Sequence, residues 1–176
     1  HKTHHLKYQY FLSNVDQEII KRNSKYLNNG YSTTGSYSKL TYQFTNENRD
    51  YVEYPLQGYY LHMEGAKYLN GSSPINHFEF IGKAEKHIEI KPHFYFGSSL
   101  KGKWSSEGYQ PYFAQSAFGF EDYVRGYEYY VIDGQKFLLS KTVFKYAIIK
   151  KTNFDIPYVK MKQFNKSHYS LYLGLF

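Results

Sequence analysis

Hydrophobic and polar residues alternate with a period of two along most of this chain. Successive side chains of a β-strand point to opposite faces, so this pattern predicts strands with one apolar and one polar face. In the first such stretch, the apolar face carries Leu6, Tyr8, Tyr10 and Leu12. The polar face of the same stretch carries His5, Lys7, Gln9 and Ser13.

The same alternation recurs at about residues 39–45, 58–64, 78–85, 90–101, 137–149 and 168–175. Asn, Gly, Ser and Pro residues mark turns between several of these stretches, and a polar connection over 150–166 precedes the last one. The only competing helical signal is a short turn near residues 15–20. The pattern therefore predicts an all-β, antiparallel fold of about seven strands.

Residues 105–134 do not follow this pattern. They are rich in Gly and aromatic residues and show no sustained alternation. A loop of this length inside a compact domain is usually functional or disordered, or it shows that the element assignment is wrong. We interpret it as a long functional loop, within one domain that spans residues 1–176.

Composition narrows the class of protein. Because the chain contains no Cys, disulfides, a thiolate nucleophile and Cys-ligated metals are excluded. Apolar runs are far shorter than the roughly 20 residues that a transmembrane helix needs. The net charge of +7 is spread along the chain, which favours solvated strand ends and turns over contact with an anionic membrane surface or nucleic acid. We predict no nucleic-acid partner.

Two all-β architectures fit the alternation. A soluble sandwich buries its apolar face, whereas a transmembrane β-barrel turns that face to lipid and its polar face to a wet interior. The predicted strands are longer than usual globular strands, and their polar faces carry large charged residues, which favours the barrel. Tyrosines near strand ends also fit the aromatic girdles of such barrels; they are Tyr26, Tyr31, Tyr51, Tyr68, Tyr109 and Tyr112.

A motif inside the long loop points to one family. Val124, Arg125, Gly126 and Tyr127 follow an aromatic-Gly approach and precede a strand, and a second segment reads Tyr-Pro-Leu-Gln-Gly over 54–58. Together they resemble the signature of the Omp85 superfamily, in its assembly-factor (BamA/TamA-like, surface-antigen) branch. The resemblance implies an integral barrel of the sixteen-strand type in the outer membrane of a Gram-negative bacterium.

The resemblance also implies a function and a set of partners. Such barrels fold and insert nascent outer-membrane proteins, with help from periplasmic POTRA domains and accessory lipoproteins, and they are not enzymes. In the family this loop folds back into the barrel, and its Arg, here Arg125, contacts the inner wall. Glu121 and Asp122 are possible local partners of Arg125, whose rigid five-donor fork suits a carboxylate.

The chain also departs from the family pattern. Only two predicted strands follow Gly126, where family members continue through several more. An open sheet of seven strands would leave two unpaired edges, which hydrocarbon does not tolerate. Residue 1 is His, not Met, so we expect an internal segment of a larger barrel. The end over 172–176 resembles either a C-terminal aromatic signal or the lead-in to the family's Asp-Gly strand.

Other functions remain as alternatives. The same scaffold could serve as a two-partner-secretion translocator or as the barrel of a patatin-type autotransporter. A small self-contained barrel or a soluble Tyr-rich binding module is the third possibility. His62 and Glu64 share a strand face, but polar lining explains this pair better than acid–base catalysis does. His77, His87 and His93 lack metal-ligand spacing, so we predict no enzyme activity, cofactor or metal.

Overall fold

A computed structural model describes residues 1–24, 26, 32–73, 75–106, 110, 115–119, 123–155 and 166–176. Residues 116, 154, 155 and 166 are described by their backbone alone. Strands account for 69% and helix for 4% of the structure. The predicted all-β class is therefore confirmed.

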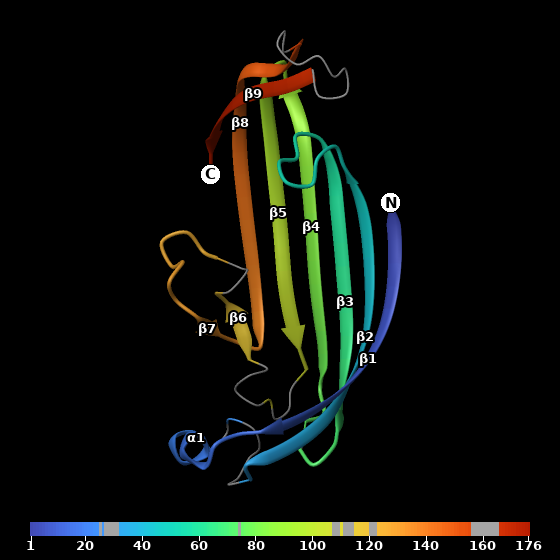
Figure 1. Cartoon of the computed structure of the whole chain (residues 1–176), viewed down its shortest axis with the longest axis vertical. Helices are drawn as coiled ribbons and strands as arrows, with labels where there is room; N and C mark the ends of the chain where they lie inside the picture. The colour runs from blue at the N-terminus through green and yellow to red at the C-terminus, as the bar shows by residue number, and fades with distance from the viewer. Residues whose placement is uncertain are drawn as a thin grey trace. The chain divides into compact units, whose positions relative to one another are not determined.

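All seven predicted strands are present, and they form one antiparallel sheet (Figure 1). In chain order its strands are β1 (Lys2–Asn14), β2 (Thr34–Arg49), β3 (Gly58–Asn70), β4 (Phe78–Lys91), β5 (Phe94–Ser105), β8 (Lys136–Asp155) and β9 (Lys166–Leu175). The sheet order is β1-β2-β3-β4-β5-β8-β9, so β1 and β9 stand at its two ends. The described residues do not close into a barrel.

Apolar residues that lie opposite each other explain the pairing of β1 with β2. Their register runs without a shift from Lys2 opposite Asn46 to Asn14 opposite Thr34. Leu6 lies opposite Tyr42, so apolar side chains meet on one face and stabilise the pair.

The strand boundaries differ from the prediction in two places. Pro92 and His93 make a tight turn between β4 and β5, so Ile90 belongs to β4 and not to the strand that follows. His93 holds a positive φ of 74°, which closes the turn within two residues. The predicted connection over 150–166 is also wrong in part, because β8 continues to Asp155 and pairs with β9.

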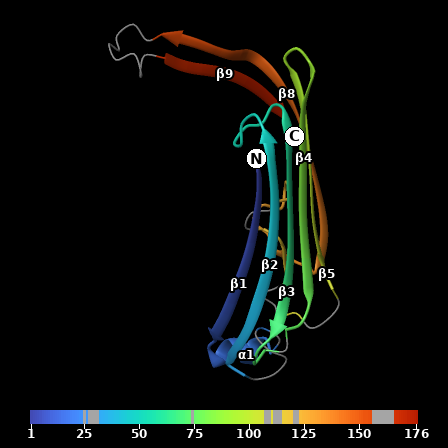
Figure 2. The same ribbon diagram turned by 90° about the vertical axis from the view of Figure 1, so that its right-hand side faces the viewer.

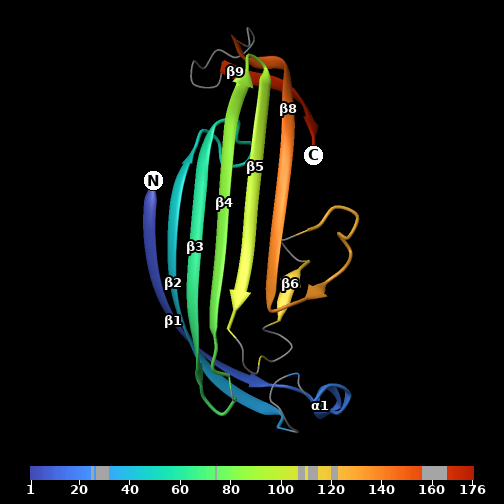
Figure 3. The same cartoon turned by 180° about the vertical axis from the view of Figure 1, so that it is seen from behind.

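Two connections contain structure of their own. The short helix α1 (Gln17–Arg22) lies between β1 and β2 (Figure 2), close to the predicted helical turn. Asp16 caps it by accepting a hydrogen bond of 2.8 Å from the backbone N–H of Glu18. In the long loop, β6 (Ser116–Phe118) pairs with β7 (Ile132–Asp133) (Figure 3). Among the described residues, no helix is long and apolar enough to cross a membrane.

The chain divides into two compact units. Unit 1 comprises His1–Glu47, Leu61–Ala84 and Leu100–Leu139, and unit 2 comprises Asn48–Tyr60, Glu85–Ser99 and Ser140–Phe176. Several strands contribute residues to both units, so the units do not follow one another along the sequence. A single domain over residues 1–176 stays a prediction.

In unit 1 the apolar face of the sheet is exposed. Leu6, Leu12 and Leu138 keep 74%, 77% and 71% of their side-chain surface exposed. A small buried cluster of Tyr37, Ala66, Tyr68 and Ile75, with Phe11 packed against it, belongs to this unit. Tyr68 is therefore buried, and its predicted place in an exposed aromatic girdle is wrong.

Unit 2 shows the same distribution. Its exposed apolar side chains come from β4, β5, β8 and β9; they include Ile90, Phe94, Phe144, Ile148, Leu171, Leu173 and Leu175. The buried side chains of this unit include His87 and Lys145. In both units many large apolar side chains are thus exposed, while Lys103 in unit 1 and Lys145 in unit 2 are buried. This distribution is unusual for a water-soluble protein.

Candidate functional site

The loop that carries the predicted motif has a short β-stem. Ser116 pairs with Asp133 and Phe118 with Ile132. Gly119 has a φ of +104°, and a Cβ there would lie 3.1 Å from the carbonyl oxygen of Tyr130. Both the conformation and the space at this position require glycine.

Val124, Arg125, Gly126 and Tyr127 form a tight turn. The backbone N–H of Tyr127 donates to the carbonyl oxygen of Val124 over 2.9 Å. Gly126 has a φ of +85°, and a Cβ there would meet nothing within 4 Å. The backbone conformation, rather than lack of space, therefore favours glycine here.

Glu128 closes this turn. Its Oε1 accepts a hydrogen bond of 3.0 Å from the backbone N–H of Gly126. Two backbone N–H groups, first its own and then that of Gly126, lower the pKa of the Glu128 carboxyl, and the charge of Arg125 adds a smaller effect. Glu121 and Asp122 were the acidic neighbours expected from the sequence, whereas the carboxylate that closes the turn belongs to Glu128. The signal that could have found it is a carboxylate two residues after a turn glycine.

The predicted motif residues lie mostly at the surface of unit 1. Arg125 is exposed, Tyr127 keeps 56% of its surface, and Val124 is half-buried. Glu121 and Asp122 lie outside the described residues. The inner-wall contact of Arg125 that the family resemblance implies stays a prediction.

A network of charged side chains covers the polar face of unit 1. Lys103 from β5 lies 3.1 Å from Glu79 of β4, and Lys39 of β2 lies 3.7 Å from both Glu79 and Glu64 of β3. The side chains of Lys103 and Glu79 keep only 7% and 6% of their surface. These side chains come from four neighbouring strands, with the two carboxylates on the inner pair and the two lysines on the outer pair, so each carboxylate has a cation beside it.

Polar neighbours complete this network. Gln43 donates to Glu64 over 2.6 Å, and the hydroxyl of Thr45 lies 3.0 Å from Nδ1 of His62. His62 and Glu64 therefore bond to two different residues of β2. The expectation that this pair is polar lining and not an acid–base pair stays a prediction.

His77 is the buried titratable group next to this network. It precedes β4, keeps 1% of its surface and stacks on Tyr68 with 4.2 Å between ring centroids. Neither ring nitrogen has a hydrogen-bond partner among the described residues. Burial, the largest influence, lowers the pKa of the His77 imidazole.

Unit 2 has its own charged pair on the polar face. Arg49 of β2 contacts Glu85 of β4 over 2.7 Å, and each side chain keeps 10% of its surface. The Arg49 guanidinium also lies 4.6 Å from the ring centroid of Tyr60. Nε2 of His87 is 3.6 Å from the same Glu85 carboxylate.

The second predicted segment, Tyr-Pro-Leu-Gln-Gly over 54–58, covers the end of the β2–β3 connection in unit 2 and the first residue of β3. Asp50 Oδ1 accepts hydrogen bonds from the backbone N–H groups of Tyr51, Leu56 and Gln57, at 2.9, 3.0 and 3.2 Å. These bonds fix the loop because one carboxylate oxygen holds both of its ends.

A lysine from β8 anchors the same loop. Lys145 Nζ donates to the carbonyl oxygen of Pro55 over 2.7 Å and lies 3.8 Å from the ring centroid of Tyr54. Tyr54 also packs against Tyr172 of β9, with ring centroids 5.3 Å apart. Burial, followed by the proximity of Tyr172, raises the pKa of the Tyr54 hydroxyl.

Nothing in the described residues points to catalysis at a metal. No group of three or more His, Cys, Asp or Glu side chains is placed to hold a metal ion in that part of the chain. No family model, curated protein or solved structure matches the sequence or the fold.

Proposed function

We propose that the chain is a segment of an outer-membrane β-barrel, with its apolar face against lipid and its polar face toward a wet interior. One observation carries the proposal. In both units many large apolar side chains are exposed, and the side chains removed from solvent include paired charges. Transmembrane barrels alternate in this sense along every strand.

The energetics favour lipid over water on the apolar face. Leaving a large apolar side chain in water, instead of burying it, forgoes about 1.5–3 kcal/mol. More than thirty large hydrophobic side chains are exposed, whereas soluble monomers rarely expose apolar patches beyond a few hundred Å². A soluble Tyr-rich module is disfavoured on this ground.

The barrel requires further strands. An unpaired strand edge leaves backbone N–H and C=O groups without partners, at a cost of several kcal/mol per group in hydrocarbon. β1 and β9 are the two end strands of the sheet. In the proposal, other strands of the same barrel pair with both.

The finer function follows from the Omp85 resemblance. The barrel folds and inserts nascent outer-membrane proteins in a Gram-negative bacterium, together with POTRA domains and accessory lipoproteins, and has no enzyme activity. The turn at Arg125 braces the barrel interior. Its well-defined geometry, with Gly126 at positive φ and Glu128 closing the turn, supports a structural role for the loop.

An experiment in cells tests this role. Arg125→Ala in the full protein is expected to lower outer-membrane protein levels or the heat resistance of the barrel. Arg22→Ala is the matched control, because Arg22 is exposed on α1 and pairs only locally with Glu18. Unchanged assembly together with unchanged heat resistance for Arg125→Ala would refute the bracing role.

A further inference from the structure

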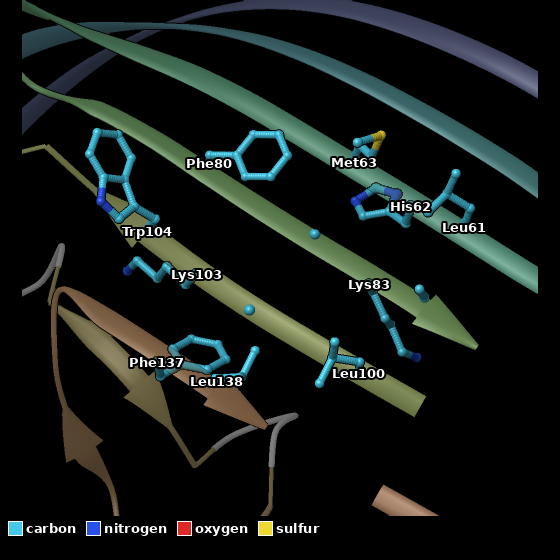
Figure 4. Close-up of a pocket in the computed structure, with 13 residues that line it drawn as sticks. Leu61, His62, Met63, Phe80, Lys83, Leu100, Lys103, Trp104, Phe137 and Leu138 are labelled. Atoms are coloured by element: carbon cyan, nitrogen blue, oxygen red, sulfur yellow. The ribbon is translucent and has the colours of Figure 1, made fainter. Parts of the chain in front are cut away.

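A groove of about 380 Å³ is hollowed into the apolar face of unit 1 (Figure 4). Apolar side chains from β3, β4, β5 and β8 form its walls; they are Leu61, Met63, Phe80, Leu100, Trp104 and Leu138. His62, Lys83 and Lys103 also contribute to its lining. The five largest exposed members, Met63, Phe80, Leu100, Trp104 and Leu138, keep 41% to 71% of their surface.

Two glycines open this groove. Gly82 of β4 and Gly102 of β5 both line it. Neither has a positive φ, and a Cβ would meet its nearest neighbour at 3.5 Å and 3.4 Å, which is ordinary contact. The backbone therefore does not require glycine at either position. What the two residues provide is the missing side-chain volume between aromatic and aliphatic walls.

Two lysine side chains make cation–π contacts with aromatic rings of the apolar face. Lys136 is exposed and lies 5.8 Å from the ring centroid of Trp104, which lines the groove. Lys67 lies 3.9 Å from the ring centroid of Phe78, at the start of β4. Lys–aromatic pairs of this kind are typical of the level at which lipid head groups meet hydrocarbon.

We propose that this groove holds an acyl chain of an anionic phospholipid whose phosphate lies against Lys136. The inference rests on the proposed function, because the apolar face meets lipid only in a membrane. A peptide would bring backbone groups that need hydrogen-bond partners, and the walls are apolar. A hydrocarbon chain needs none, and the exposed cation at Lys136 supplies complementary charge for a phosphate.

The sequence supplies its own reporter for this site. Trp104 is the only Trp within residues 1–176, so tryptophan fluorescence reports on the groove alone once any Trp elsewhere in the barrel is replaced by Phe. The test inserts the full barrel into vesicles, not residues 1–176 alone, and titrates brominated phosphatidylglycerol or brominated phosphatidylcholine, whose bromines quench a tryptophan that they contact. We expect about fivefold stronger apparent binding of the anionic lipid, the effect of one Lys near an anionic surface.

Variants separate the groove from the general lipid contact. Filling it with Gly82→Leu or Gly102→Leu is expected to remove the preferential quenching. Gly65→Leu is the matched control, because Gly65 lies on β3, does not line the groove, and its Cβ would meet nothing within 4 Å. Lys136→Gln should abolish the preference for the anionic lipid while quenching by both lipids persists.

The outcomes distinguish a failure of the groove site from a failure of the proposed membrane placement. Equal quenching by both lipids, unchanged by the leucine variants, would overturn the groove site and leave the membrane placement intact. No quenching by either brominated lipid would overturn the proposed function itself. If Gly65→Leu also removes the preference for the anionic lipid, the loss in all three leucine variants reflects altered insertion. That result would also overturn the groove site.

Discussion

The substitution Leu6→Arg places a charge in the middle of β1 on the apolar face. Leu6 keeps 74% of its side-chain surface exposed and lies opposite Tyr42 on β2, which keeps 50%. Because so little of Leu6 is buried against protein, the substitution removes few contacts. Its effect on stability therefore reports almost entirely on the solvent at that face.

The change in the free energy of unfolding that Leu6→Arg causes depends on whether water or lipid surrounds that face. On a water-exposed surface, such a change alters the free energy of unfolding by at most about 0.5 kcal/mol. At the midplane of a bilayer, an Arg on the lipid face of a barrel costs about 2–4 kcal/mol, or roughly 30-fold or more in the folding equilibrium. Near the interface the cost falls to about 0–1 kcal/mol.

The assay is guanidinium unfolding of the full barrel in phosphatidylcholine vesicles, followed by the fluorescence of Trp104 with any Trp outside residues 1–176 replaced by Phe. Leu12→Arg is the matched control, because Leu12 is 77% exposed but lies near the end of β1. We expect a loss of about 2–4 kcal/mol for Leu6→Arg and about 0–1 kcal/mol for Leu12→Arg. A Leu6→Arg protein within about 0.5 kcal/mol of the parent would refute the lipid contact.

Three further predictions concern individual contacts. Lys145→Met removes the charged donor to Pro55, so the 50–57 loop should exchange its amide hydrogens faster, with a stability loss of about 1.5–3 kcal/mol. Gly126→Ala should cost about 1–2 kcal/mol in thermal or denaturant unfolding because of the positive φ, whereas Gly65→Ala should not. The pKa of the His77 imidazole is lower in the folded chain than in the unfolded chain. As the pH falls below about 6.5, this imidazole is therefore protonated in the unfolded chain before it is protonated in the folded chain. Stability should therefore fall on acidification through this range, and His77→Phe should reduce that fall in pH-dependent unfolding.

Controls sharpen these three tests. Lys141→Met also removes a lysine of β8 in unit 2, but one that is exposed, so loop exchange should stay unchanged. Equal acceleration in both lysine variants would contradict the anchoring role of Lys145. His5→Phe removes an exposed histidine. An acid dependence that His77→Phe leaves intact would contradict the assignment to His77.

The strands could be predicted because their signal is local. Each of the seven alternates with period two, and backbone geometry turns that period directly into two faces. The boundaries could not be predicted as well. The polar residues 150–155 look like a connection in sequence, yet they belong to β8 because Asn153 pairs with His168 of β9. Such pairing depends on residues far away in the chain.

The candidate site was predicted less completely than the strands. The motif around Gly126 was recognised, but its tight turn and the role of Glu128 were not, since the choice among nearby carboxylates depends on turn geometry. The charged network of Lys39, Glu79 and Lys103 joins three strands. Strand register decides which charges meet, and a single sequence does not encode register in a readable form. The same reason explains why Tyr68 was misplaced.

Whether the apolar face of the sheet meets lipid is tested most directly by measuring the environment of successive residues along β1. Residues 1–176 contain no Cys, so single cysteines at positions 6 to 10 of the full barrel, with any Cys elsewhere replaced by Ser, can be spin-labelled in vesicles. Collision with oxygen reports lipid, and collision with a water-soluble nickel complex reports water. If the apolar face meets lipid, we expect oxygen access at Leu6, Tyr8 and Tyr10 and nickel access at Lys7 and Gln9. Nickel access at all five positions, or no alternation, would contradict the lipid contact.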